Sequence, residues 1–249
     1  MPRLLMLTNA WGYFTLENVS SKFTPYPNVY LPCYDRPDFL HPGFLMHIDR
    51  ESVKTIVQAG CFDASDTVLL SQVFPAEIHA FECNPEALAT ARKNLASQNS
   101  IHLVDRAAWN AECQIPFYPV VATLSEGKEI DNPGASSCFK ARPDYLSRYE
   151  QKETTVAAMR LDTYCAQQKI TNVDLLCMDV QGAELRVLEG LGELLHTVRF
   201  VITEIEVQPI YYEQSLYPEI DAYLRSYGLR QVAEVYRDPW FSDYLYRRD

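Results

Sequence analysis

The sequence predicts an α/β fold with a mostly parallel, doubly wound sheet that carries an antiparallel strand pair at its C-terminal end. From about residue 50 onward, short apolar runs alternate with amphipathic stretches, which is typical of βαβ units with helices on both faces of a sheet. The last two apolar runs, at 229–236 and 241–247, are close enough to pair antiparallel. The chain has 249 residues, of which 47% are apolar and 22% charged, as expected for a globular α/β protein.

Strands are predicted at the short apolar runs, and helices at the amphipathic stretches between them. Asn84 is expected to cap a helix that begins at Pro85, because its side-chain oxygen can accept a backbone N–H. Gly228 is expected just after the end of another helix. The predicted strands are 55–60, 77–83, 101–108, 113–121, 154–161, 173–179, 198–206, 229–236 and 241–247. The predicted helices are 64–74, 84–98, 162–169, 183–195 and 216–227.

The composition divides the chain into an arm and a domain. Residues 1–48 hold six of the fifteen prolines and nine of the thirty aromatic residues, which predicts an irregular arm with a short strand at Arg3–Leu7. Its aromatic side chains would form a packing extension, a dimer arm or a wall of the substrate pocket. Residues 49–249 would form the main domain, with a loop and strand insertion at about 111–160. Within it, 122–150 reads as a long loop, of a kind that often serves as a lid.

Charge and composition limit the partners. There are 33 acidic and 22 basic residues, so the formal charge is −11 and nucleic acid is not expected as a partner. No apolar run approaches the ~20 residues of a membrane span, and Leu4–Leu7 is too short for a signal peptide. The seven cysteines have no metal-binding spacing and are expected as free thiols in the cytoplasm. A neutral hydroxylated molecule or a cationic cofactor fits this charge, and a homo-oligomer is left open.

Three predicted strands end in residues that suit ligand binding, which in such sheets takes place at the carboxyl ends of the strands. Gly60 allows a tight turn after the first strand. Glu82 follows it by 22 positions, the spacing at which an acidic side chain accepts hydrogen bonds from ribose hydroxyls, although a carboxylate beside a helix N-terminus would also look like this. Asp179 ends a buried strand beside Gly182 and could orient a substrate hydroxyl, take its proton, bind a cation or cap a helix.

Two further carboxylates come from the strand at 198–206. Strand periodicity places Glu204 and Glu206 on the same side of the sheet, where they could form a hard-metal site with Asp179. The sequence has no fixed ligand spacing for a metal, so no metal is predicted.

The order and spacing of these segments resemble the FkbM family of S-adenosylmethionine-dependent methyltransferases. The resemblance runs from about residue 53 to 235 and implies a Rossmann-like methyltransferase fold. Its most specific piece is MDVQGAE, which is similar to the family's IDVEGAE. The other pieces are the Gly60 turn with Asp63, AFECNP at 80–85, DRAAWN at 105–110, GASS at 134–137, Arg160-Leu161-Asp162 and Thr203-Glu204-Ile205.

The resemblance implies S-adenosylmethionine as the cofactor and a set of site residues. The catalytic residues would be Asp179, as general base, and Glu204. The cofactor would lie with its methionine end over Gly60–Asp63, its ribose on Glu82 and its adenine near Asp105–Ala107. The full set of cofactor residues is Gln58, Gly60, Cys61, Asp63, Glu82, Cys83, Asp105, Arg106, Ala107 and Asp179. The substrate residues would be Ser136, Ser137, Gln181 and Glu206. Gln58 and Gln181 depart from the family, which usually has Asp and Glu at these positions.

Three functions are considered. The resemblance implies an O-methyltransferase that acts on a hydroxyl of a sugar, glycan or secondary metabolite. The two glutamines leave open a cofactor-binding protein of the same fold with impaired catalysis. A nicotinamide-dependent oxidoreductase is disfavoured, because the sequence has no glycine-rich pyrophosphate turn and no Tyr-x-x-x-Lys pair.

Overall fold

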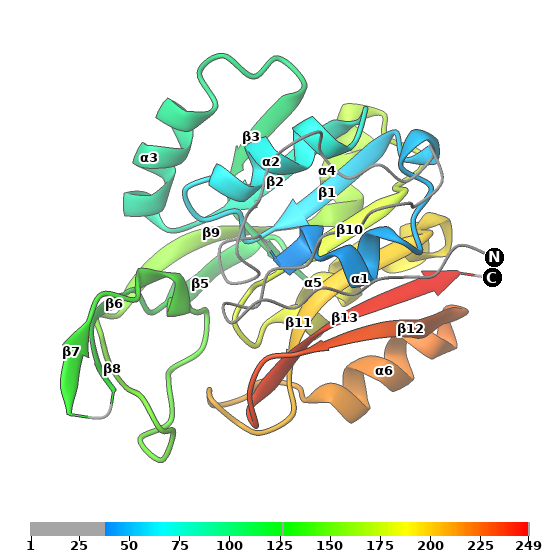
Figure 1. Cartoon of the computed structure of the whole chain (residues 1–249). Coiled ribbons are helices and arrows are strands. Elements are labelled where there is room, and N and C mark those ends of the chain that lie inside the picture. The colour runs from blue at the N-terminus through cyan, green and yellow to red at the C-terminus, as the bar shows by residue number, and fades with distance from the viewer. Residues whose placement is uncertain (1–37, 126, 249) are drawn as a thin grey trace, which may run out of the picture.

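A seven-stranded sheet forms the centre of the structure, a computed structural model that describes residues 38–125 and 127–248 (Figure 1). Its strand order is β12-β13-β11-β10-β1-β2-β3. The five strands from β11 to β3 are parallel, and β13 pairs antiparallel with both β11 and β12, which confirms the predicted fold class. The strands are β1 (Thr55–Ala59), β2 (Glu77–Glu82), β3 (Ile101–Asp105), β10 (Leu175–Met178), β11 (Phe200–Glu206), β12 (Leu229–Tyr236) and β13 (Phe241–Arg248).

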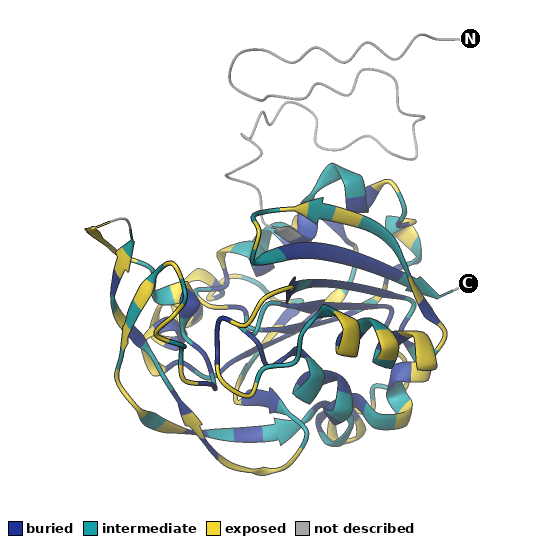
Figure 2. Ribbon diagram, turned by 90° about the horizontal axis from the view of Figure 1, so that it is seen from below, coloured by how far each residue is buried: buried dark blue, intermediate teal, exposed yellow. Residues whose placement is uncertain are grey.

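Helices cover both faces of this sheet, because alternate residues of each strand enter different apolar clusters. Ile56 packs with the helices of one face, whereas its neighbour Val57 packs with those of the other. In Figure 2 the ribbon of the central strands is mostly dark blue, the colour of buried residues. The first face carries α1 (Pro42–Leu45), α2 (Ser65–Val73) and α3 (Pro85–Asn94), and the second carries α4 (Leu161–Gln168), α5 (Glu184–Leu191) and α6 (Tyr217–Ser226).

The insertion between β3 and α4 contains two small sheets. One has the order β4-β9-β5, and the other has the order β7-β6-β8 and forms the lobe at the left of Figure 1. The prediction of a loop over 122–150 was therefore wrong. The strands of the lobe are short and mostly exposed, so they lack the apolar alternation by which strands are found in a sequence. The bounds are β4 (Ala107–Trp109), β5 (Cys113–Phe117), β6 (Val120–Ser125), β7 (Lys128–Ile130), β8 (Arg148–Gln151) and β9 (Thr154–Arg160).

Three other predicted elements are divided in the structure. The strand predicted at 113–121 is split between β5 and β6, because the chain leaves the β4-β9-β5 sheet after Phe117 and enters the sheet of the lobe at Val120. The strand predicted at 101–108 breaks at Arg106, because β3 is the edge of the central sheet and the chain after it pairs with β9 instead. The helix predicted at 183–195 ends at Leu191, and a 3-10 helix, η5 (Gly192–Thr197), follows. The predicted cap is confirmed, since Asn84 Oδ1 accepts the Glu86 N–H at 3.1 Å. Gly228 follows α6 with a φ of +80°.

Part of the predicted arm packs into the domain. Residues 38–48 form η2 (Asp38–Leu40) and α1, and they bury Phe39, Phe44 and Ile48 in the apolar cluster of the first sheet face. They are therefore not irregular. The strand predicted at Arg3–Leu7 lies outside the described residues. No helix within the described residues is long and apolar enough to cross a membrane.

Candidate active site

The turn after β1 approaches the end of β10 at the carboxyl edge of the sheet. Gly60 has a φ of +78°, and a Cβ atom built there would lie 1.9 Å from the carbonyl oxygen of Asp179. The glycine is thus required by close packing of two strand ends, whereas the sequence suggested contact with a ligand. Phe62 and Ala64 also have positive φ values, of 48° and 62°. Such backbone strain costs about 1–3 kcal/mol per residue and is concentrated at functional sites.

Glu82 is held at the end of β2 by the backbone. Its Oε2 accepts the Phe62 N–H at 2.7 Å, and its Oε1 accepts the N–H groups of Cys83 and Asn84 at 2.8 and 2.7 Å. Burial raises the pKa of Glu82 to about 7, against the lowering effect of these three hydrogen bonds. Asp179, which faces it, raises this pKa further. The carboxyl group therefore has a fixed orientation and titrates near neutral pH.

A hydrogen-bonded network joins the ends of β10 and β11. The amide nitrogen of Gln181 donates to Asp179 Oδ1 at 2.6 Å and to Glu204 Oε1 at 3.1 Å. The hydroxyl of Tyr211 lies 2.8 Å from Gln181 Oε1 and 3.0 Å from the carbonyl oxygen of Ala135. Residues that are distant in sequence thus hold the carboxylates of Asp179 and Glu204 near each other.

Two more acids lie behind this network, almost completely buried. Glu184 Oε1 accepts the N–H groups of Val180 and Gly182 at 3.2 and 3.4 Å, which holds the turn that carries Gln181. Among the described residues, Oε2 of Glu184 and Oε2 of Glu206 have no hydrogen-bond partner. Burial raises the pKa of Glu184 to about 7 and that of Glu206 well above its usual value. Glu184 and Asp179 raise the pKa of Glu206 further.

A cavity of about 220 Å³ opens among these groups. Glu82 lines it from β2, and Asp179 and Gln181 line it from the end of β10. A second cavity of about 200 Å³ adjoins it, because Cys83 and Arg106 line both. Together the two cavities follow the carboxyl edge of β1, β2 and β3, where a parallel sheet binds its ligands.

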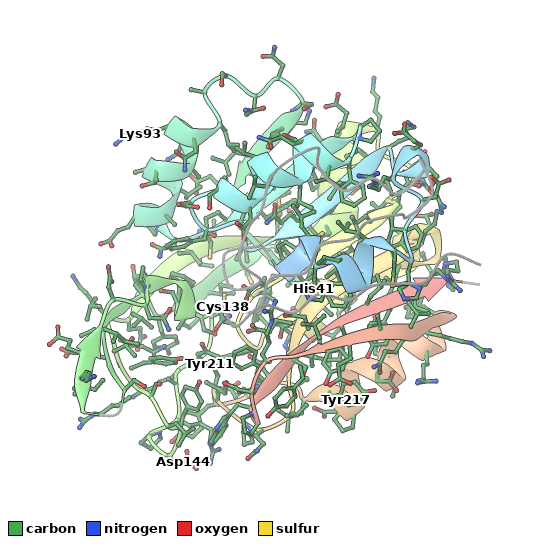
Figure 3. All side chains as sticks on the ribbon, in the orientation of Figure 1. His41, Lys93, Cys138, Asp144, Tyr211 and Tyr217 are labelled. Carbon is green, nitrogen blue, oxygen red and sulfur yellow. The ribbon has the colours of Figure 1, made fainter. Side chains whose placement is uncertain are left out.

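The segment 133–139 contributes part of the cavity wall. Both predicted serines line the cavity from this segment. Ser137 is buried and donates to the backbone oxygen of Gln181 at 2.7 Å, while Ser136 donates to Pro133 O at 2.6 Å. Figure 3 labels Cys138 of this segment and Tyr211 between the central sheet and the β6-β7-β8 lobe. The serine hydroxyls thus hold the segment in place.

Other predicted residues lie outside the main cavity. Gln58 is buried and accepts a hydrogen bond from Thr67 at 2.8 Å, Cys61 is buried, and Asp63 accepts the Ser65 N–H at 2.9 Å. Asp105 pairs with Arg92 at 2.6 Å and lines the second cavity. Glu204 and Glu206 are likewise not among the lining residues. The complete lining of the main cavity also includes Gly60, Phe62, Asp66, Phe81, Cys83, Asn84, Arg106, Ala107, Ala108, Phe117, Gly134, Val180 and Ala183.

Sequence reasoning missed several members of this site. Asp66 and Asn84 line the cavity at helix starts, a position that suggests capping. Tyr211 gave no sequence signal, because it lies outside the predicted elements. Within residues 38–125 and 127–248, no group of three or more His, Cys, Asp or Glu side chains is arranged to hold a metal ion.

A doubly wound sheet with a buried acid after its second strand and further acids after β10 defines a Rossmann-like α/β protein with a ligand site at the carboxyl edge. The sequence model of the family described as "Methyltransferase FkbM domain" matches residues 68–230. The chain therefore belongs to the FkbM methyltransferase domain family, and the resemblance noted in the sequence is confirmed.

Two relatives have known names. The chain is 32% identical over 161 residues to the 2-O-methyltransferase NoeI of Sinorhizobium fredii, which covers 63% of this chain and 65% of that protein. It is 28% identical over 184 residues to the 31-O-demethyl-FK506 methyltransferase FkbM of Streptomyces tacrolimicus, which covers 66% of this chain and 67% of that protein. The chain thus spans about two thirds of the length of these relatives. Among solved structures, TehB of Haemophilus influenzae is similar with a TM-score of 0.47 and 10% identity, over 84% of this chain and 63% of that one.

Proposed function

We propose that this protein is an S-adenosylmethionine-dependent O-methyltransferase that acts on a hydroxyl group of a sugar, glycan or secondary metabolite. The observation that carries the proposal is that Glu82 and Asp179 line one cavity at the carboxyl edge of the sheet. Membership of the FkbM methyltransferase domain family supports the reaction class. The names of both relatives specify transfer to an oxygen, which supports a hydroxyl acceptor.

The residues of the site fit S-adenosylmethionine. Glu82 offers an oriented carboxyl group to ribose hydroxyls, and Oε2 accepts only one backbone N–H, so it retains acceptor capacity. Arg106 and Ala107 would hold the adenine where the two cavities adjoin. Gly60 and Phe62 would hold the methionine end beside the acidic network. When bound, the cofactor supplies a methyl group on a positively charged sulfur, which is already activated for transfer.

The protein has two tasks in such a reaction. It must align the acceptor oxygen with the methyl group, since correct orientation contributes much of the rate acceleration in a group transfer. It must also remove the hydroxyl proton as the new bond forms, because a neutral aliphatic hydroxyl is a poor nucleophile. Asp179 lines the cavity and would take this proton from the acceptor hydroxyl, which makes it the proposed catalytic residue.

The acceptor would enter beside the segment 133–139. Ser136, Ser137 and Gln181 line the cavity there, and the two serine hydroxyls retain acceptor capacity that suits a hydroxylated molecule. The formal charge of −11 disfavours nucleic acid as the acceptor. A cytoplasmic location remains a prediction from the sequence.

Calorimetry and a transfer assay test this function together. Titration with S-adenosylmethionine should release heat at a single site, whereas NADH should give none. Methyl transfer from radiolabelled cofactor to a panel of sugars, glycans and macrolides should identify the acceptor. Tight binding of NADH in place of S-adenosylmethionine would contradict the proposal, and cofactor binding without transfer to any acceptor would favour the catalytically impaired alternative.

A further inference from the structure

Gln181 uses every polar group of its side chain within the site. One N–H of its amide reaches Asp179 Oδ1 at 2.6 Å and the other reaches Glu204 Oε1 at 3.1 Å. Its carbonyl oxygen lies 2.8 Å from the hydroxyl of Tyr211. An amide has two donor hydrogens and one acceptor oxygen, so this arrangement satisfies the whole group and fixes which end faces the carboxylates.

The backbone of Gln181 is held in an unusual conformation. Its φ is +53°, in the left-handed region that a non-glycine residue enters at a cost. Ser137 Oγ donates to the backbone oxygen of Gln181 at 2.7 Å. The Glu184 carboxyl group accepts the N–H groups on either side of Gln181, at residues 180 and 182. The surrounding structure therefore maintains a strained residue at the cavity wall, which points to a function for its side chain.

An amide is the side-chain group best suited to this position. Two carboxylates that approach the same point repel each other, which disfavours ionisation of both. A cation between them would also relieve the repulsion, whereas a third carboxylate would increase it. The Gln181 amide is neutral and still donates one hydrogen bond to each acid, so it stabilises both ionised forms at once.

We propose that Gln181 is a positioning residue that orients the Asp179 carboxylate toward the acceptor hydroxyl and keeps it ionised beside Glu204. This inference rests on the proposed function of Asp179. Gln181 acts through Asp179 and does not itself take the proton. Tyr211 holds Gln181 in turn, because its hydroxyl lies between the Gln181 amide oxygen and the Ala135 backbone oxygen of segment 133–139. The position of that segment is thereby coupled to the orientation of the base.

Acids from three other elements face Asp179. They are Glu82 at the end of β2, Glu184 on α5, and Glu204 and Glu206 on β11. Tyr211 also faces Asp179, while Tyr145 and Tyr149 face Glu204 and Glu206. A variant that changes the charge at position 181 therefore shifts the pKa values of several acids at once. Its effect must be compared with that of an uncharged variant at the same position.

Three variants separate the contributions of this network. Gln181→Met keeps the length of the side chain and removes both donors, Gln181→Glu replaces the donors by a charged acceptor, and Tyr211→Phe removes only the hydroxyl. Matched controls are Gln208→Met and Tyr212→Phe, since both residues are exposed and lie outside the network. All proteins would be assayed as the full chain, with S-adenosylmethionine and the acceptor found in the panel.

The positioning role predicts a specific kinetic pattern. In Gln181→Met, kcat should fall on the order of 10–100-fold, while affinity for S-adenosylmethionine changes by less than about three-fold. The acidic limb of the pH profile of kcat should move upward by about one unit in Gln181→Met and further in Gln181→Glu, because both changes favour the protonated base. Tyr211→Phe should lower kcat by about 3–10-fold, and both controls should match the wild type. A wild-type kcat and pH profile in both Gln181 variants would overturn the proposal.

Thermal unfolding tests the same arrangement without an activity assay. Gln181→Glu should resemble the wild type at about pH 5 and lose stability progressively toward pH 8, because its carboxyl group ionises beside two acids. Gln181→Met should be least destabilised at low pH, and its loss should stop growing once Asp179 and Glu204 are ionised, because it removes the donors that favour the ionised acids but adds no further charge. If the wild type transfers methyl to no acceptor, the proposed function has failed, but this series still decides whether Gln181 holds the two carboxylates. A Gln181→Glu protein as stable as the wild type across this range would overturn that arrangement.

Discussion

Affinity for the cofactor should depend on pH through Glu82. Burial raises the pKa of this side chain to about 7, so its protonation changes near neutral pH. Two adjacent ribose hydroxyls donate hydrogen bonds, and a carboxylate accepts them better than a protonated carboxyl group does. The bound ribose should therefore favour the ionised form, and binding below pH 7 should release a proton.

The size of the pH effect on cofactor affinity follows from the pKa of Glu82. With a pKa of about 7, roughly nine tenths of Glu82 is ionised at pH 8 and roughly one tenth at pH 6. If the ribose binds only the ionised form, the dissociation constant should rise about tenfold between these two values, or about 1.4 kcal/mol. Solvent screening changes this estimate little, because Glu82 is only 8% exposed.

Calorimetry with S-adenosylhomocysteine is the appropriate assay. This product has the same ribose and no charge on sulfur, so electrostatic attraction of a sulfonium to the other acids does not contribute. Titrations at pH 6, 7 and 8 in buffers with different heats of ionisation would give both the dissociation constant and the number of protons released.

Two variants identify the group responsible. Glu82→Gln should bind weakly at every pH and show no pH dependence. Glu184→Gln should retain the dependence, although the pKa of Glu184 is also about 7, because Glu184 does not line the cavity. An affinity that is flat from pH 6 to 8, or an unchanged pH dependence in Glu82→Gln, would refute the reasoning.

Three further outcomes are expected. Asp179→Asn should lower the rate of methyl transfer on the order of 10²–10⁴-fold, while its affinity for the cofactor stays within a few-fold of the wild type. If a chelator abolished the activity of the wild type and magnesium restored it, Asp179 would instead bind a metal ion. Gly60→Ala should lower the free energy of unfolding by about 2–4 kcal/mol, because its Cβ would meet the Asp179 carbonyl oxygen at 1.9 Å; a wild-type melting temperature would contradict this. The pKa of Glu206 is raised, so the wild type should lose stability as pH rises above the usual range of a glutamate. Glu206→Gln should therefore be more stable relative to the wild type at pH 8 than at pH 4. If the free energies of unfolding of the wild type and Glu206→Gln changed in parallel with pH, Glu206 would not be a buried titrating acid.

The sequence by itself determined the central sheet and its local features. The runs that form β1, β2, β10 and β11 are short, apolar and separated by amphipathic stretches, so burial on both faces can be read from them directly. Asn84 and Gly228 were predictable because a helix cap depends on residues only two or three positions away. The position of Glu82 followed from a fixed spacing, since one βαβ unit brings it near the Gly60 turn.

The small strands of the lobe were decided by tertiary structure. β7 is exposed along its whole length and β8 at half of its residues, so neither has the apolar pattern that would predict pairing with β6. The partner of Gly60 was likewise hidden from the sequence, because the backbone oxygen that excludes a Cβ there belongs to Asp179, on a different strand. Parallel strands bring such distant segments together, and no local pattern records the contact.

The arrangement of the acids was also decided only by the fold. The sequence placed Asp179 and Glu204 at neighbouring strand ends, but it could not show that Gln181 would turn its amide between them or that Tyr211 would hold that amide. Each of these contacts depends on side-chain direction and on a left-handed backbone conformation that other parts of the chain impose. The sequence therefore determines which strand ends carry the acids of the site, because strand periodicity and spacing are local. The tertiary structure determines which groups touch, because hydrogen bonds between distant segments exist only after the whole sheet has formed.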